Sequence, residues 1–239
     1  MNKDLFKQEL EKLNINVTEE QLKKLDIYAN FLLEYNKHTN LTAIKDIDQV
    51  YLKHFYDSLT LVKSIDLTSI NNMIDIGTGP GFPGMVIKIF FPHIKMTLLD
   101  SNNKKITFLK ELNNLLKLEN VNITNARAEE FCVNNRESYD LVTARAVSNM
   151  TVLTELCLPL TKIGGYFIAL KGSDDNEITE SEYAIKELGG QIESITNFKL
   201  PIEESTRNIV KIKKVNQTSK QYPRRYDKIT KNPLKKKGK

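Results

Sequence analysis

The sequence predicts an α/β fold in which a mostly parallel sheet is covered by helices. Apolar residues lead into Asp75 and then into a loop rich in glycine, and a helix-length apolar run follows as far as Pro92. Strand-like and helix-like segments then alternate, which is typical of a parallel sheet. The segments 191–199 and 208–215 are both strand-like with no helix between them, so we expect a terminal antiparallel hairpin.

Residues 1–68 are predicted to form a helical N-terminal extension. Apolar side chains recur at helical spacing within 4–13, 18–33 and 50–62. Thr18-Glu-Glu-Gln21 is a capping box, which marks the start of the second helix. The stretch from Asn36 to Thr42 breaks the helical pattern, so the helix is expected to stop there.

Residues 69–215 are predicted to form the α/β domain. The paired glycines at 164–165 and 189–190 mark exits from helices. Ligands of such a sheet collect at the carboxyl ends of its strands, so residues there should carry the function. The expected strands before the hairpin are 73–76, 95–99, 121–124, 140–143 and 166–170, and the expected helices are 84–91, 103–116, 148–160 and 176–188.

Composition narrows the class of protein. A chain of 239 residues with 40% hydrophobic content can bury one sizeable core with a small appendage. It has neither an apolar run of membrane-spanning length nor a charged-then-apolar leader, so we expect a cytoplasmic protein without a membrane segment. Two cysteines and three scattered histidines suggest neither a disulfide framework nor a metal site.

Residues 216–239 form a basic C-terminal tail. From Lys211 onward the chain carries twelve Lys or Arg side chains and one acid, although the whole chain has a net charge of only +5. One interpretation is a solvated, disordered end. The other is a contact with RNA, because Tyr222-Pro-Arg-Arg-Tyr226 mixes aromatic rings with guanidinium groups.

The glycine loop is the strongest sign of a cofactor site, and it fits two patterns. Gly79-Pro-Gly-Phe-Pro-Gly84 matches the dinucleotide fingerprint, but its prolines suit the helix entry of that motif poorly. The pattern Asp75-x-Gly77-x-Gly79-x-Gly81 resembles the glycine loop of methyltransferases that use S-adenosylmethionine. That cofactor is a sulfonium cation, so a carboxylate near the loop would be useful. A purely structural glycine turn is the remaining alternative.

Polar residues follow the next two expected strands. Asp100 ends the second, 25 residues after Asp75, where its carboxylate can accept the hydroxyls of a ribose. The alternative is that Asp100 caps the helix 103–116. After the third strand comes Arg127-Ala-Glu-Glu130, where backbone groups could contact an adenine.

The fourth and fifth strands end in cationic residues. Arg145 follows an apolar strand and needs a partner, which could be Glu129 or Asp75. Alternatively it contacts the cofactor or a nucleic-acid substrate. Lys171 ends the fifth strand.

Several motifs stand in the order and spacing of one protein family. They are Asn40-Leu-Thr-Ala-Ile44, His54-Phe-Tyr-Asp-Ser58, Asp75 to Gly84, Leu99-Asp-Ser101, Lys104 to Leu109, Arg127-Ala-Glu129, Ala144-Arg-Ala146, Lys171-Gly172, Tyr222 to Arg225 and Lys231 to Leu234. With these motifs the chain resembles, over nearly its whole length, the bacterial 16S ribosomal RNA (guanine-N7) methyltransferases, also called glucose-inhibited division protein B. Pro80 and Met85-Val86 depart from the usual pattern of that family, which leaves loop detail open.

The resemblance implies a class I, Rossmann-like methyltransferase with a seven-stranded sheet, S-adenosylmethionine as cofactor and 16S ribosomal RNA or the small ribosomal subunit as partner. We expect a monomer without a metal. The expected cofactor contacts are Gly77, Gly79, Phe82, Asp100, Ala128, Glu129 and Arg145.

Asn40, His54 and Lys171 are substrate-side candidates, and Asp57 is a motif residue of uncertain role. Two of these assignments have alternatives. Phe82 could be the first core residue of the following helix instead of a cofactor contact, and His54 could be a packed helix residue instead of a substrate contact.

The chemistry favours catalysis without a general base. Nitrogen 7 of guanine has an in-plane lone pair and no proton, so positioning and electrostatics should suffice. Thr143-Ala-Arg-Ala146 is unlike the motif expected for exocyclic nitrogens, and Cys132 and Cys157 are expected in the core rather than as nucleophiles. A nicotinamide-dependent oxidoreductase, a non-catalytic RNA-binding protein and a protein methyltransferase remain alternatives.

Overall fold

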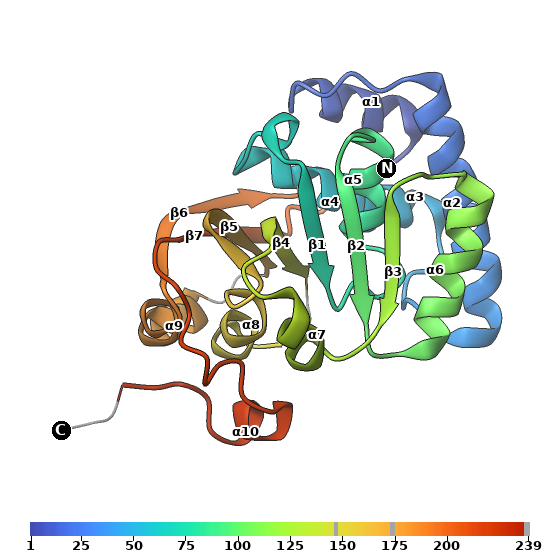
Figure 1. The fold of residues 1–239 in the computed structure, drawn as a ribbon. Coiled ribbons are helices and arrows are strands. Elements are labelled where there is room, and N and C mark those ends of the chain that lie inside the picture. The colour runs from blue at the N-terminus through green and yellow to red at the C-terminus, as the bar shows by residue number, and fades with distance from the viewer. Residues whose placement is uncertain (146–147, 173–174, 237–239) are drawn as a thin grey trace.

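The computed structural model describes residues 1–145, 148–172 and 175–236. Its centre is a seven-stranded sheet with the order β3-β2-β1-β4-β5-β7-β6 (Figure 1). Strands β1 to β5 pair in parallel, and β7 runs antiparallel to both β5 and β6. This confirms the mostly parallel sheet and its terminal hairpin. The strands are β1 (Asn72–Ile76), β2 (Lys95–Asp100), β3 (Val121–Asn125), β4 (Tyr139–Arg145), β5 (Thr161–Lys171), β6 (Gly190–Lys199) and β7 (Thr206–Lys214).

The N-terminal extension is helical, as predicted, but it is divided differently. The capping box at Thr18 is present, and α2 ends at Thr39, within the stretch from Asn36 to Thr42 where the helix was expected to stop. The Asn36 side chain bonds the backbone N and O of Thr42, and Asn40 in the left-handed conformation then ends the helix. The elements are α1 (Lys3–Glu11), α2 (Glu19–Thr39), α3 (Ile47–Val50), the π-helix η1 (Tyr51–Tyr56), α4 (Asp57–Leu59) and the 3₁₀ turns η2 (Thr60–Lys63) and η3 (Leu67–Ser69).

Helices cover both faces of the sheet. The N-terminal helices pack with α5 (Gly84–Phe90) and α6 (Asn103–Leu116) in one apolar core. The second core contains side chains of α7 (Ala128–Asn135), α8 (Met150–Cys157) and α9 (Asp175–Glu187). Neighbouring residues of β1 alternate between them, since Met73 belongs to the first core and Ile74 to the second. Sequence reasoning did not predict α7.

The C-terminal tail is ordered over residues 216–236. Its short helix α10 (Tyr226–Lys231) lies at the end of the sheet where β1, β2 and β3 finish (Figure 1). Tyr222 and Ile229 are buried in the second core. The interpretation of this segment as a solvated, disordered end is therefore wrong. In the described part of the chain, no helix is both long and apolar enough to cross a membrane.

Candidate cofactor and substrate pockets

Asp75 fixes the glycine loop that follows β1. Its carboxylate is fully buried, and Oδ2 accepts hydrogen bonds from Thr78 Oγ1 at 2.7 Å and from the Gly84 amide at 2.9 Å. Burial raises the pKa of Asp75 to about 7, and these two hydrogen bonds oppose the rise. Gly84 is required here because a Cβ would lie 2.4 Å from a methyl group of Leu98. Asp75 therefore stabilises the conformation of the loop, and it is not among the described residues that line the two pockets below.

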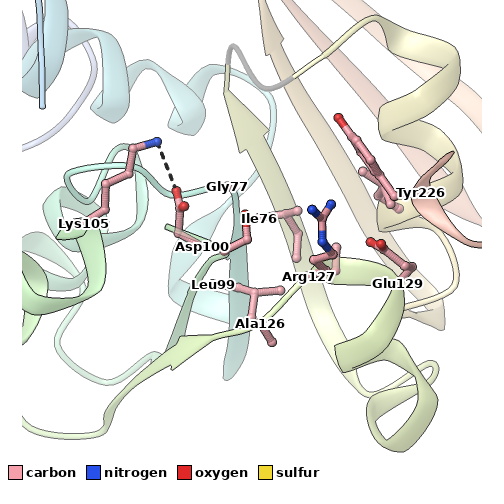
Figure 2. Close-up of a pocket in the computed structure, with 12 residues that line it drawn as sticks. Ile76, Gly77, Leu99, Asp100, Lys105, Ala126, Arg127, Glu129 and Tyr226 are labelled. Carbon is pink, nitrogen blue, oxygen red and sulfur yellow. Dashed lines mark hydrogen bonds and ion pairs between the residues drawn. The ribbon is translucent and has the colours of Figure 1, made fainter. Parts of the chain in front are cut away.

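Asp100 holds the same loop from the end of β2. Its side chain is almost buried; Oδ2 accepts a hydrogen bond from the Gly79 amide at 2.9 Å, and Oδ1 accepts one from the Asn102 amide at 2.8 Å. Lys105 Nζ lies 3.5 Å from Oδ2 (Figure 2). The N-cap of α6 is Asn102, so the alternative interpretation of Asp100 as the cap of this helix is wrong.

A pocket of about 310 Å³ lies at the carboxyl ends of β1, β2 and β3 (Figure 2). It brings together four of the seven predicted cofactor contacts: Gly77, Asp100, Ala128 and Glu129. Gly77 has φ of +64°, which glycine adopts readily. The described lining residues are Ile76, Gly77, Leu99, Asp100, Ser101, Lys105, Ala126, Arg127, Ala128, Glu129, Leu156 and Tyr226, and thus do not include Gly79, Phe82 or Arg145.

Tyr226 is a lining residue that sequence reasoning missed. The tail residue had been interpreted as an RNA contact or as part of a disordered end. It instead reaches the pocket from α10, and the guanidinium of Arg127 lies 5.4 Å from its ring centroid (Figure 2). No local sequence signal pairs Tyr226 with Arg127, because the two residues are about a hundred positions apart in the chain.

Phe82 is a core residue of the loop. It is 3% exposed, and its ring stacks on His54 at 4.3 Å and on Tyr28 at 5.2 Å between centroids. This agrees with the alternative interpretation of Phe82 as core, although the residue precedes α5 rather than belonging to it. Its packing joins the glycine loop to the N-terminal extension. A cofactor contact by Phe82 stays a prediction.

Arg145, the last residue of β4, points to the N-terminal extension. Its guanidinium donates to Asp57 Oδ2 and to the Lys53 carbonyl, both at 3.1 Å, and lies over the Phe82 ring at 5.2 Å. The second carboxylate oxygen of Asp57 accepts a hydrogen bond from Arg207 Nε at 3.1 Å. Asp57 is thus the acidic partner of two arginines.

The partners expected for Arg145 were Glu129 or Asp75, and this expectation is wrong. Asp57 forms the ion pair with Arg145, whereas Glu129 lines the first pocket and Asp75 bonds the glycine loop. The sequence could not reveal this pair because 88 positions separate the two residues.

A second pocket of about 310 Å³ surrounds Arg145. Lys171 belongs to it, donating to the Ser148 carbonyl at 2.9 Å and forming an ion pair with Glu177 at 2.6 Å. The pocket therefore unites Arg145 with the substrate-side candidates His54 and Lys171. Its described lining residues carry four cationic side chains and one carboxylate: Lys53, His54, Asp57, Arg145, Leu170, Lys171, Gly172 and Arg207. Ala146, part of the motif around Arg145, lies outside the described residues.

His54 is neutral at physiological pH. Burial, together with the positive charge of Arg145, lowers its pKa to about 3. Its Nδ1 lies 3.3 Å from an Arg145 nitrogen and its Nε2 lies 2.9 Å from Thr42 Oγ1. Nδ1 can therefore accept from the guanidinium while Nε2–H donates to the hydroxyl. A histidine with this pKa is a poor proton acceptor.

Asn40 lies apart from the other substrate-side candidates. It ends α2 with φ of +50° and lines a separate hollow of about 740 Å³ together with Asn36 and Lys45. Its neighbour Thr42 connects this hollow to His54. The structure thus brings Asn40 near the second pocket without placing it among the described residues that line it.

The two cysteines are unsuited to nucleophilic catalysis. Both are buried, and burial raises the pKa of Cys132 to about 11 and the pKa of Cys157 well above its usual value. In the parts of the chain that the structure describes, no three His, Cys, Asp or Glu side chains are grouped to hold a metal ion.

The comparisons with known proteins decide the family. The family model of GidB, described as rRNA small subunit methyltransferase G, matches residues 21–210. The chain belongs to the GidB family. The resemblance found in its motifs is therefore confirmed, and membership in GidB decides for a methyltransferase over a nicotinamide-dependent oxidoreductase.

Two curated relatives match this chain over nearly their full length. The chain is 48% identical to "Ribosomal RNA small subunit methyltransferase G" of Bacillus licheniformis, covering 98% of this chain and 99% of that protein. It is 47% identical to the protein of the same name from Bacillus subtilis, with the same coverage.

Two solved structures share the fold. A SAM-dependent methyltransferase from Aquifex aeolicus matches with a TM-score of 0.54 at 16% identity, covering 72% of this chain and 96% of that one. The precorrin-6y C5,15-methyltransferase of Geobacter metallireducens matches with a TM-score of 0.51 at 18% identity, covering 66% of this chain and 87% of that one. The predicted class I methyltransferase fold is confirmed.

Proposed function

We propose that this protein transfers the methyl group of S-adenosylmethionine to nitrogen 7 of a guanine in the 16S RNA of the small ribosomal subunit. The observation that carries the proposal is a pair of pockets bordering one glycine loop. Gly77 of the loop lines the first, and Phe82 of the loop packs beneath Arg145 of the second. A methyl donor and an RNA base held in these pockets would meet at the loop.

The residues of the first pocket fit the cofactor. Asp100 Oδ1 accepts one hydrogen bond, from the Asn102 amide, so it keeps capacity to accept from a ribose hydroxyl, whereas Oδ2 accepts from both the Gly79 amide and Lys105. Ala128 begins α7, which leaves backbone groups available for an adenine. Gly77 exposes backbone without a side chain in the way. Gly79, Phe82 and Arg145 are not among the described lining residues of this pocket, so a cofactor that contacts them would have to extend beyond it.

The second pocket suits a base within RNA. Its four cationic side chains have three carboxylate partners, because Asp57 pairs with both arginines, Glu203 with Lys53 and Glu177 with Lys171. The remaining excess of positive charge attracts a phosphodiester backbone. The Arg145 guanidinium, fixed by Asp57, offers a planar face and donors of the kind that recognise bases and phosphates. His54, Arg145 and Lys171 then position the substrate rather than move a proton.

The reaction needs no general base. S-adenosylmethionine supplies an electrophilic methyl group on a sulfonium centre. The lone pair of nitrogen 7 forms the new N–C bond while the C–S bond breaks and its electron pair stays on sulfur. No proton leaves, which agrees with a His54 pKa of about 3. The product base carries a positive charge, so the cationic lining of the second pocket repels it and aids release.

Methyl transfer from labelled S-adenosylmethionine tests the proposal. Purified protein is incubated with small-subunit ribosomal RNA, naked and in assembled subunits, and the nucleosides are separated by mass. We expect label in 7-methylguanosine from one of the two substrates. Label in another nucleoside, or only in a protein of the subunit, contradicts the proposed reaction.

The proposal includes the oligomeric state of the protein and its location in the cell. We infer a monomer that works in the cytoplasm without a metal ion. Sedimentation at working concentration, and activity after treatment with a chelator, test the two physical points.

A further inference from the structure

The C-terminal tail contributes a wall to the first pocket. Tyr226 is the first residue of α10 and one of the lining residues of that pocket. It lies across from Asp100, beside Arg127 and Glu129 (Figure 2). The residue is 36% exposed, so part of its surface faces the pocket or solvent instead of being packed away.

Buried contacts hold the tail in this place. Arg224 binds Glu155 of α8 through its backbone amide at 2.9 Å and through two guanidinium nitrogens at 2.9 and 2.7 Å. The Glu155 side chain is 1% exposed, and its pair with Arg224 is therefore shielded from water. Ile229, one helical turn after Tyr226 in α10, is fully buried in the second core.

A second anchor precedes α10 in the chain. The Arg136 guanidinium donates to the carbonyls of Tyr222 and Thr218. Thr218 is buried, and its hydroxyl accepts a hydrogen bond from the amino group of Lys214. The segment from 218 to 229 is thus fixed at both ends, so Tyr226 is held at the rim of the pocket rather than carried on a free arm.

We propose that Tyr226 is a cofactor-contacting residue and that its ring, backed by the guanidinium of Arg127, closes the first pocket over bound S-adenosylmethionine. This rests on the proposed function, because it takes the cofactor from there. An aromatic ring at a pocket rim covers apolar surface of a ligand, attracts a cationic group over its face and loses little conformational freedom on binding. The tail therefore belongs to the cofactor site as well as to any RNA-binding surface.

Calorimetric titration with S-adenosylmethionine tests the contact. Tyr226→Ala should raise the Kd about tenfold, whereas Tyr226→Phe, which keeps the ring, should stay close to the wild type. Tyr183→Ala is the matched control: Tyr183, on α9, is 40% exposed and lines a different hollow. It should leave the Kd unchanged. Thermal unfolding without the cofactor checks that each variant is folded.

A fluorescent reporter gives a readout independent of affinity. The chain has no tryptophan, so Tyr226→Trp introduces a single indole at the pocket. Its emission should change on titration with S-adenosylmethionine and saturate at the calorimetric Kd, while Tyr183→Trp stays silent. If the wild type binds the cofactor but Tyr226→Ala binds equally well and the Tyr226→Trp signal does not move, the inference fails. If the wild type does not bind it, the proposed function fails.

Discussion

Replacing Asp57 by asparagine tests the network that holds the second pocket. The carboxylate pairs with Arg145 and with Arg207, each at 3.1 Å, and the side chains of the three residues are 8%, 15% and 23% exposed. Asparagine has the same shape but only one acceptor oxygen, so its amide NH₂ faces one guanidinium. The change removes the charge and about one of the two charge-assisted hydrogen bonds.

The expected cost follows from these contacts. A hydrogen bond to a charged group contributes about 1.5–3 kcal/mol, and removing one partner of a fully buried pair costs about 3–5 kcal/mol. Because both arginines keep some contact with water, we expect Asp57→Asn to lower the free energy of unfolding by about 2–3 kcal/mol. Displacement of Arg145 should also reduce kcat/KM for RNA by up to about 100-fold.

Urea unfolding and methyl-transfer kinetics provide the assay. Asp227→Asn is the matched control, since Asp227 pairs with Arg225 at 3.4 Å at the surface and should cost less than about 1 kcal/mol. The Kd for S-adenosylmethionine should not change, because Asp57 lies outside the described lining of the first pocket. Equal stability of the two variants would refute the role of Asp57, and a lost cofactor affinity would show that the two pockets are not distinct.

Three further predictions concern the cofactor, the pH dependence of stability and the tail. Asp100→Asn should raise the Kd for S-adenosylmethionine about 10- to 100-fold by calorimetry, and an unchanged Kd would remove Asp100 from the site. The folded-state pKa of His54, about 3, lies below its usual 6.5, so the unfolded chain binds the extra proton. The stability that wild type has over His54→Gln should therefore shrink as pH falls from 6.5, by at most about 1.4 kcal/mol per pH unit in urea titrations, whereas a constant difference would contradict the pKa. Neutralising Lys220, Lys228 and Lys231 with glutamine should reduce the slope of log K for RNA against log salt by about 2, and an unaltered slope would mean that the tail makes no phosphate contacts.

Substitutions separate the charge of the tail from its packing, which a deletion would not. Removing residues 217–239 would take Tyr222 and Ile229 out of the second core. Their loss would destabilise the body and the first pocket along with any RNA contact. The three lysines are exposed, so replacing them changes charge with little effect on packing.

Most of the sheet could be predicted because its signals are local. Apolar runs placed every strand within a few residues, apart from β5, which begins five residues before its expected start at 166. The helix 103–116 was predicted to the residue. Helix α7 was missed because its polar sequence, Ala128–Asn135, shows little amphipathic pattern. The N-terminal helix 50–62 divided into short π and 3₁₀ turns, and helical spacing alone does not distinguish these.

The site was predictable where it depends on position along a strand, and unpredictable where it depends on contacts across the fold. Gly77, Asp100 and Ala128 follow parallel strands, so topology alone brings them together. Arg145 follows one as well, but its partner Asp57 comes from the N-terminal extension. Tyr226 reaches the pocket only because Arg224 and Ile229 dock the tail. Such contacts have no signature in local sequence.

Methyl transfer to RNA made with 7-deazaguanine tests the central claim most directly. This analogue keeps the Watson–Crick edge of guanine but has carbon in place of nitrogen 7, so it lacks the attacking lone pair. We predict that the protein binds such small-subunit RNA as it binds the unmodified RNA and transfers no label from S-adenosylmethionine to it. Label transfer at an undiminished rate would contradict attack by nitrogen 7.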